Sequence, residues 1–145
     1  MSKRETVIIL RDILDQIEKL ERFIANTDYD GFVNDDMRYY ASLRCLELIG
    51  EAVRQLPAEF KEKYSEIEWG KIVDLRNIII HEYFAIESEI IWDIVKNKAP
   101  ELKKFINGIL NGWNGVKPKI YILQTNKFPA GKLSSWNRKL SLMEA

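Results

Sequence analysis

The first long segment of the chain carries apolar side chains at steps of three and four residues. Such residues share one face of an α-helix, because the helix turns once in about 3.6 residues. Charged residues such as Asp15, Glu18 and Lys19 fill the other face. The spacing predicts an amphipathic helix of about five turns over residues 7–24. Its apolar positions are Val7, Leu10, Ile13, Leu14, Ile17, Leu20, Phe23 and Ile24.

The same spacing predicts further helices up to residue 110. After turn residues at 29–31, a second helix starts at Asn34 or Asp35, both good N-cap types, and ends before Pro57. Residues 57–64 predict a short helical turn, and residues 68–83 and 87–97 predict two more helices. Pro100, a typical first helical residue, opens a last helix that reaches residue 110. The apolar stripe predicted for the second helix is Tyr39/Tyr40, Leu43, Leu46, Ile49, Val53 and Leu56.

These helices predict an all-α fold, an up-and-down helical bundle. The isoleucines at 78–80 could form a strand, but no alternating partner segment lies nearby. Gly50 lies within the apolar stripe of the second helix, where glycine costs about 0.8–1.0 kcal/mol relative to alanine. We expect this glycine to let another helix approach closely.

The charged residues are distributed unevenly along the chain. The 22 basic residues balance 22 acidic ones, which argues against nucleic-acid binding through overall charge. Residues 1–110 hold 16 basic and 21 acidic residues, whereas residues from 111 onward hold six and one. Turn signals also cluster in the second part, at Asn111-Gly112, Asn114-Gly115 and Pro129. We therefore predict a helical domain over residues 1–110 and a basic, turn-rich, non-helical extension over 111–145.

The extension over residues 111–145 has two interpretations. It is either a flexible or loosely docked tail, or a basic strap that covers a partner or RNA. The second interpretation depends on Trp113, Tyr121 and Trp136, which lie among lysines, since aromatic rings stack on bases.

The chain contains one cysteine, Cys45, and one histidine, His81. An internal disulfide and a multi-cysteine or multi-histidine metal site within one chain are therefore excluded. We expect no metal and no cofactor. The short apolar run at residues 7–10 is interrupted by Arg11, so it predicts neither a signal peptide nor a membrane span. The expected location is the cytoplasm, with no membrane partner.

The segment from Leu75 to Tyr83 is apolar yet contains Arg76, Asn77 and the single histidine. Arg76 and His81 are five residues apart, which places them about 140° apart around an ideal helix. For the two residues to act together, one of three arrangements is needed. Either the Arg76 side chain reaches around the helix to His81, or the helix end is bent, or a second copy of the helix completes the site. A half-buried histidine with a structural role is the alternative to a catalytic one.

In combination with its neighbours, this segment resembles a known family. Residues 76–83 match the R-x4-H-x-Y signature of HepT-like toxins, a branch of the HEPN (higher eukaryotes and prokaryotes nucleotide-binding) superfamily. Residues 44–53 resemble the R-x-L-E-x-I-G-E-A motif of that family, and residues 10–14 resemble its opening helix. The resemblance covers residues 5–110 and implies a helical homodimer that acts as a metal-independent RNase. It also implies an antitoxin partner, an MntA-like nucleotidyltransferase that adds AMP to the motif tyrosine.

The resemblance implies roles for individual residues. Arg76 and His81 would be the catalytic pair, and Tyr83 would be the AMPylated tyrosine. Asn77, Glu47 and Glu51 would support the site. From their charge we add Arg44, Arg54 and Lys71 as candidate RNA-binding residues.

The implied chemistry is consistent with these residue types. RNA is cleaved without metal when its 2′-hydroxyl attacks the adjacent phosphorus, which requires a base, an acid and cationic donors. Two histidines facing each other in a two-fold dimer would supply base and acid. Two other interpretations stay open: a non-catalytic HEPN module that binds nucleotide or a nucleotidyltransferase partner, and a purely structural helical dimer.

Overall fold

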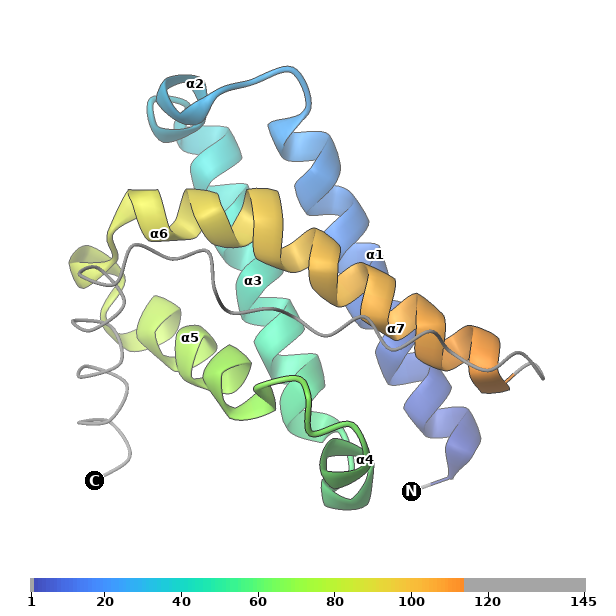
Figure 1. Cartoon of the computed structure of the whole chain (residues 1–145). Coiled ribbons are helices and arrows are strands. Elements are labelled where there is room, and N and C mark those ends of the chain that lie inside the picture. The colour runs from blue at the N-terminus through green and yellow to red at the C-terminus, as the bar shows by residue number, and fades with distance from the viewer. Residues whose placement is uncertain (1, 114–145) are drawn as a thin grey trace.

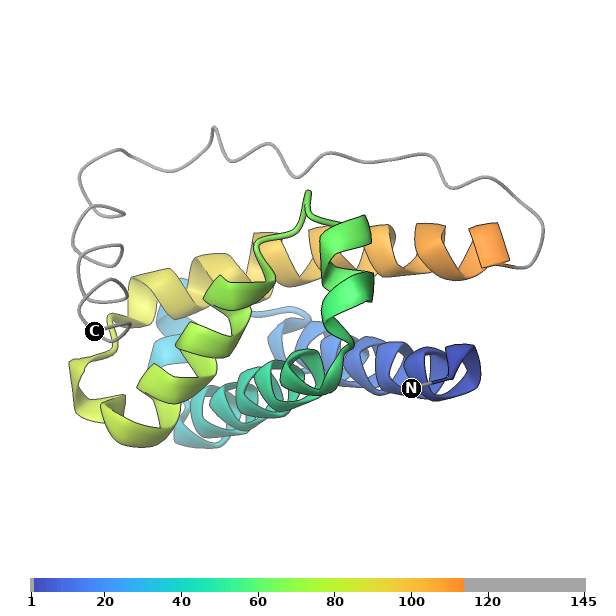
Figure 2. The same ribbon diagram turned by 90° about the horizontal axis from the view of Figure 1, so that it is seen from below.

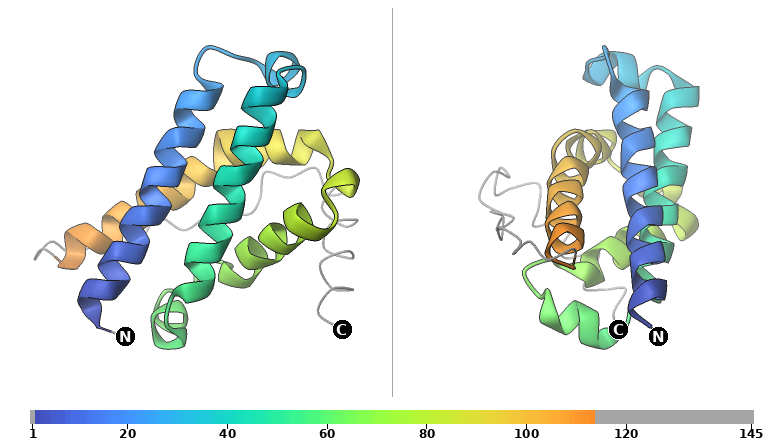
Figure 3. Two further views of the ribbon diagram at one scale, coloured as in Figure 1. Left: turned by 180° about the vertical axis from the view of Figure 1, so that it is seen from behind. Right: turned by 90° about the vertical axis from the view of Figure 1, so that its right-hand side faces the viewer.

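Two long antiparallel helices, α1 (Lys3–Ile24) and α3 (Asp36–Gln55), lie side by side and form one layer of the structure (Figures 1 and 3). The computed structural model describes residues 2–113, and these residues contain helices and no strand. The prediction of an all-α, up-and-down bundle is confirmed. The other elements are α2 (Tyr29–Val33), α4 (Ala58–Lys63), α5 (Trp69–His81), the 3-10 turn η1 (Tyr83–Ala85), α6 (Ser88–Asp93), the π-helical turn η2 (Ile94–Lys98) and α7 (Ala99–Trp113).

The continuous run of α6, η2 and α7 forms a second layer across the α1–α3 pair (Figure 2). It packs on α1 and α2, and an ion pair of 3.1 Å between Lys103 and Glu21 joins α7 to α1. Helix α5 packs along α3 in the opposite direction (Figure 1). Between the layers lies the apolar core, and its fully buried large side chains include Leu10, Ile13, Ile17, Leu20, Phe32, Val53, Ile91, Val95, Ile106 and Ile109.

The helix starts follow local capping chemistry. Helix α1 begins at Lys3, earlier than predicted, because Ser2 and Glu5 form a capping box. The Glu5 backbone N–H donates to Ser2 Oγ at 3.2 Å, and the Ser2 N–H donates to the Glu5 carboxylate at 2.6 Å. Asp35 caps α3, as predicted for one of two candidates. The expected turn at 29–31 is instead the short helix α2, which Asp28 caps.

Gly50 marks the place where α5 crosses α3. A Cβ at position 50 would lie 2.3 Å from the Cβ of Arg76 and 3.1 Å from the carbonyl oxygen of Ile72. The prediction that this glycine permits a close helix approach is confirmed. The crossing also brings Arg76, one of the residues expected to act on substrate, against the backbone of α3.

Helix α5 ends at His81, two residues before the predicted end at Tyr83. The Glu82 N–H donates to the Ile78 carbonyl at 2.8 Å, and the chain then enters the 3-10 turn η1. No glycine or proline marks this end in the sequence. The apolar spacing that predicted this helix therefore extends past His81, the residue at which the helix ends.

The predicted break before Pro100 is wrong, because the chain stays helical from Ser88 to Trp113. Proline lacks an N–H and its ring clashes with the carbonyl four residues earlier in a regular α-helix. The preceding turn, η2, is instead π-helical, and the Ala99 N–H donates to the carbonyl of Ile94, five residues back. This wider turn accommodates the ring without ending the helix.

The last helix, predicted to reach residue 110, is three residues longer. Helix α7 continues to Trp113 despite the Asn111-Gly112 turn signal. The ring of Trp113 packs edge-on against Phe60 at 6.0 Å, and Lys3 Nζ lies 5.2 Å from its centroid. These contacts explain why the helix persists. Trp113 therefore packs on the bundle, while the expectations for 114–145 lie outside the described residues.

Within residues 2–113, no helix is both long enough and apolar enough to cross a membrane.

Candidate functional site

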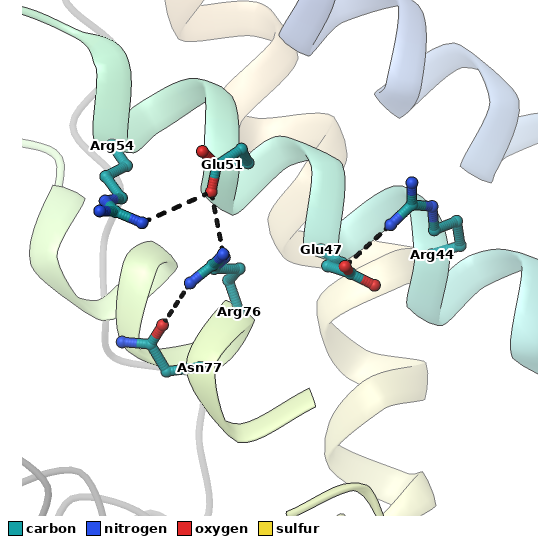
Figure 4. A network of polar contacts seen from close by, with 6 residues as sticks. All are labelled: Arg44, Glu47, Glu51, Arg54, Arg76 and Asn77. Carbon is teal, nitrogen blue, oxygen red and sulfur yellow. Dashed lines mark hydrogen bonds and ion pairs between the residues drawn. The ribbon is translucent and has the colours of Figure 1, made fainter. Parts of the chain in front are cut away.

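Arg76 lies at the centre of a polar network between α3 and α5 (Figure 4). Its Nη2 lies 3.1 Å from Oε2 of Glu51, which projects from α3. Its Nη1 donates a hydrogen bond of 2.8 Å to Oδ1 of Asn77, the next residue on α5. The structure thus brings together one predicted catalytic residue and two of the three predicted supporting residues.

The guanidinium of Arg76 is largely withdrawn from solvent. Only 20% of its side chain is exposed, compared with 40% for Glu51. Its Nε is buried and has no hydrogen-bond partner among the described residues. Buried donors are nearly always satisfied, so an unsatisfied one is typical of a site that awaits a ligand or carries strain. A planar guanidinium is suited to the oxygens of carboxylates and phosphates.

Other charged residues on the outer face of α3 flank this network. Arg54 Nη1 lies 3.9 Å from the same Glu51 oxygen, so two guanidinium groups share one carboxylate. Nearer the start of α3 than Glu51, Arg44 Nη1 donates a hydrogen bond of 2.8 Å to Glu47 Oε1. Arg44 and Arg54, two of the predicted RNA-binding residues, therefore share the helix stripe of Glu51. The third supporting residue, Glu47, pairs with Arg44 rather than with Arg76 (Figure 4).

Lys71 lies apart from this network. Its Nζ pairs with Glu68 at 2.8 Å, at the N-terminal end of α5. Lys71 precedes Arg76 by five residues, which corresponds to about 140° around the helix. Lys71 and Arg76 therefore face different sides of α5.

His81 is the last residue of α5, and its side chain is exposed. The interpretation as a half-buried structural histidine is therefore wrong. The helix is α-helical up to His81, so a bent helix end does not bring its imidazole to Arg76. Arg76 instead reaches around to Asn77, which lies one turn before His81 on the same stripe.

Tyr83 lies in the turn η1, after the end of α5. The helix predicted over residues 68–83 would have placed Tyr83, seven residues after Arg76, on the same face, but α5 ends at His81 and the two residues do not belong to one helix. The tyrosine remains two residues from His81 along the chain. The position of its side chain lies outside what the structure describes.

Exposed apolar residues occur on the elements that carry the site, and the sequence reasoning missed them. Met37 and Tyr40 lie on the stripe of α3 that continues through Arg44, and their exposed fractions are 85% and 58%. Of the two tyrosines predicted for one stripe position, Tyr39 packs inward, with its ring 5.5 Å from that of Phe32, and Tyr40 is exposed. On α5 and η1, the exposed residues are Ile80 (36%) and Phe84 (79%).

Two titratable groups near the core are perturbed by burial. Desolvation raises the pKa of the Cys45 thiol and the pKa of the Tyr39 hydroxyl. Neither group belongs to the Arg76 network. Among residues 2–113, no group of three or more histidine, cysteine, aspartate or glutamate side chains is arranged to hold a metal ion.

The sequence matches the family model described as "Ribonuclease HepT-like" over residues 13–109. This match covers more than half of the chain and includes the whole network around Arg76. The chain belongs to the HepT-like ribonuclease family.

Related proteins of this family support the assignment. A candidate RNase of Methanocaldococcus jannaschii is 43% identical over 104 residues, which is 72% of this chain and 95% of that protein. A candidate ribonuclease HepT of Thermococcus cleftensis is 36% identical over 101 residues, which is 70% of this chain and 92% of that protein. No solved structure matches the chain significantly.

One relative matches beyond the helical region. A protein of Methanocaldococcus jannaschii, named as a gamma-glutamylcyclotransferase and candidate RNase, is 33% identical over 141 residues. The match spans 97% of this chain and 62% of that protein. The sequence after residue 113 therefore has a counterpart in this longer relative, although its structure lies outside the described region.

Proposed function

We propose that this HepT-like protein is a metal-independent endoribonuclease and the toxin of a toxin–antitoxin pair. The observation that carries the proposal is the placement of Arg76: a largely buried guanidinium is held at a helix crossing, and the single histidine lies exposed on the same helix. Membership of the ribonuclease family supports the choice of RNA as substrate. The chemistry would be attack of the ribose 2′-hydroxyl on the adjacent phosphorus.

The reaction needs one group to take a proton and another to give one. In the attack, an imidazole of His81 takes the 2′-hydroxyl proton as the bond from the 2′-oxygen to phosphorus forms. The bond from phosphorus to the 5′-oxygen breaks, and a second imidazole, protonated, gives its proton to that oxygen. The products are a 2′,3′-cyclic phosphate and a 5′-hydroxyl. Arg76 stabilises the charge that develops on the phosphorane oxygens.

The chain has one histidine, so two imidazoles in one groove require two chains. A two-fold dimer would present His81 from each protomer across an isologous interface. The exposed Met37, Tyr40, Ile80 and Phe84 support this proposal, since apolar side chains near a site are typical of an interaction surface. The same dimer would place Arg76 of one protomer near His81 of its partner.

RNA binding would use the arginines that flank Arg76. Arg44 and Arg54 have side chains about three-fifths exposed, at 62% and 61%, and their ion pairs lie at the surface. Such pairs contribute only about 0–1 kcal/mol, so a phosphate group can replace the carboxylate partner at little cost.

We further propose that a nucleotidyltransferase antitoxin inactivates the enzyme at Tyr83. In this step the phenolic oxygen attacks the α-phosphorus of ATP, pyrophosphate leaves, and an AMP group remains on the tyrosine. The added phosphodiester anion would lie two residues from His81 and would hinder RNA. Modified protein that cleaves RNA at an undiminished rate would contradict this step.

The ribonuclease proposal is tested with purified protein and RNA in the presence of EDTA. We expect cleavage that leaves 2′,3′-cyclic phosphate ends, and a loss of at least about 10²-fold in His81→Ala. Because His81 is exposed, the free energy of unfolding should stay within about 0.5 kcal/mol of wild type. Nucleotide binding without cleavage by the wild type would instead favour a non-catalytic module, and would refute the enzymatic proposal.

A further inference from the structure

We infer that Gly50 and Glu51, two consecutive residues of α3, act as a mount that fixes the position of the Arg76 guanidinium. Gly50 sets the place of the side-chain stem, and Glu51 sets the direction of the tip. The inference rests on the proposed ribonuclease function. It adds Gly50 and gives Glu51, until now only a predicted supporting residue, a defined positioning role, and both residues lie on a different helix from Arg76 and His81.

Gly50 acts through the absence of a side chain. A Cβ built at this position would lie 2.3 Å from Cβ and 3.0 Å from Cγ of Arg76, whereas ordinary contacts begin at 3.4 Å. The third close atom, the Ile72 carbonyl oxygen at 3.1 Å, belongs to the backbone of α5. None of these atoms is the flexible end of a side chain. Any residue larger than glycine must therefore move α5, and Arg76 with it, by about 1 Å.

Glu51 acts on the other end of the same side chain. Its Oε2 lies 3.1 Å from Nη2 of Arg76, while Asn77 accepts from Nη1 at 2.8 Å. The two nitrogens at the tip of the guanidinium are thus contacted from two helices, by an ion pair from α3 and by a hydrogen bond from the next residue of α5 (Figure 4). This arrangement restricts rotation of the planar group before any substrate arrives. Arg54 approaches the same carboxylate at 3.9 Å, so the carboxylate does not cancel the positive charge of the cluster.

A fixed guanidinium matters for the proposed reaction because its contribution to the rate depends on its position relative to the phosphorane oxygens. Donors that already point to the phosphorane oxygens cost no reorganisation in the transition state. A displacement of about 1 Å can reduce the rate about 10²-fold. We therefore expect the mount to act mainly on kcat, and to act less on KM, to which other phosphate contacts contribute.

The first test replaces Gly50 with alanine and uses Gly70→Ala as its matched control. Both glycines lie in helices of the same crossing pair, but a Cβ at Gly70 meets nothing within 4 Å. Helix propensity favours alanine at both positions. We expect Gly50→Ala to lower kcat about 10- to 100-fold, and Gly70→Ala to cleave RNA like the wild type. Equal activity of the two variants would overturn the role of Gly50.

The second test does not depend on the helix crossing. Glu51→Gln removes the charge from a side chain that is 40% exposed, so the fold should tolerate the change. Glu62→Gln, on the exposed surface of α4, is a control for the same change in net charge. We expect kcat to fall about 10-fold in Glu51→Gln alone. A higher rate in Glu51→Gln would mean that the carboxylate competes with RNA for Arg76, and would overturn the inference.

A spectroscopic measurement separates this inference from the ribonuclease proposal. In ¹⁵N-edited NMR spectra of the wild type, we expect separate, slowly exchanging Nη signals for Arg76, assigned by their loss in Arg76→Lys. Glu51→Gln should merge these signals, and Gly50→Ala should shift the Nε signal. Rapid guanidinium rotation in the wild type would refute the mount whether or not the protein cleaves RNA. Absent cleavage with slow rotation would refute only the proposed function.

Discussion

Replacing Arg76 with lysine should separate the contribution of this residue to stability from its contribution to activity. Lysine keeps the positive charge and the stem atoms Cβ and Cγ that pack on Gly50. A single ammonium cannot hold both Glu51 at 3.1 Å and Asn77 at 2.8 Å in the geometry of the planar guanidinium. Losing the hydrogen bond to Asn77 should cost about 0.5–1.5 kcal/mol of unfolding free energy.

The expected effect of Arg76→Lys on activity is much larger. The guanidinium presents two parallel donors to the phosphorane oxygens, and a single preorganised donor contributes about 10²–10³ in rate in comparable sites. We therefore expect kcat to fall at least about 10²-fold while the protein remains folded. Denaturant unfolding followed by far-ultraviolet circular dichroism measures the stability, and RNA cleavage in EDTA measures the rate.

Two results would refute this reasoning. The first is an Arg76→Lys variant that cleaves RNA within a fewfold of wild type, which would show that charge alone is sufficient. The second is a loss of activity no larger than the unfolded fraction of the variant. Arg76→Ala is the comparison variant, since it also removes the stem that packs at the helix crossing. It should be less stable than Arg76→Lys and no more active.

Three further predictions concern the rest of the molecule. Met37→Glu places an acidic residue in the first turn of α3, where negative charge stabilises the helix of the monomer. The same change puts a charge on an exposed apolar surface, so it should weaken dimerisation at least about 10-fold in sedimentation equilibrium. Phe32→Ala, at a fully buried ring 5.2 Å from Trp92, should lower the unfolding free energy by about 3–5 kcal/mol in denaturant titration. Burial raises the pKa of the Cys45 thiol, so the unfolded chain loses this proton first and stability falls above about pH 8.5. Cys45→Ala should reduce that alkaline loss, and an unchanged pH profile would contradict the assignment.

Much of the site could be predicted from the sequence, because its chemistry lies in residue types and in one motif. Arg76, Asn77 and Glu51 were expected to act together, and the structure brings them into one network. The orientation of the guanidinium toward Glu51 could not be predicted, since it depends on how α3 and α5 cross. Lys71 was predicted to bind RNA on charge alone; it pairs with Glu68 near the start of α5, and its role stays a prediction.

The sequence by itself determined the helices and the glycine that lets two of them meet. Apolar spacing and capping residues act within a few residues, so α1, α3 and the cap at Asp35 follow from local pattern. Only the tertiary structure decided that α5 stops at His81 and that the chain stays helical through Pro100. At those points packing between distant segments outweighs local preference. Packing also decided which apolar side chains remain exposed on the elements that carry the site, because periodicity alone does not show which faces are covered.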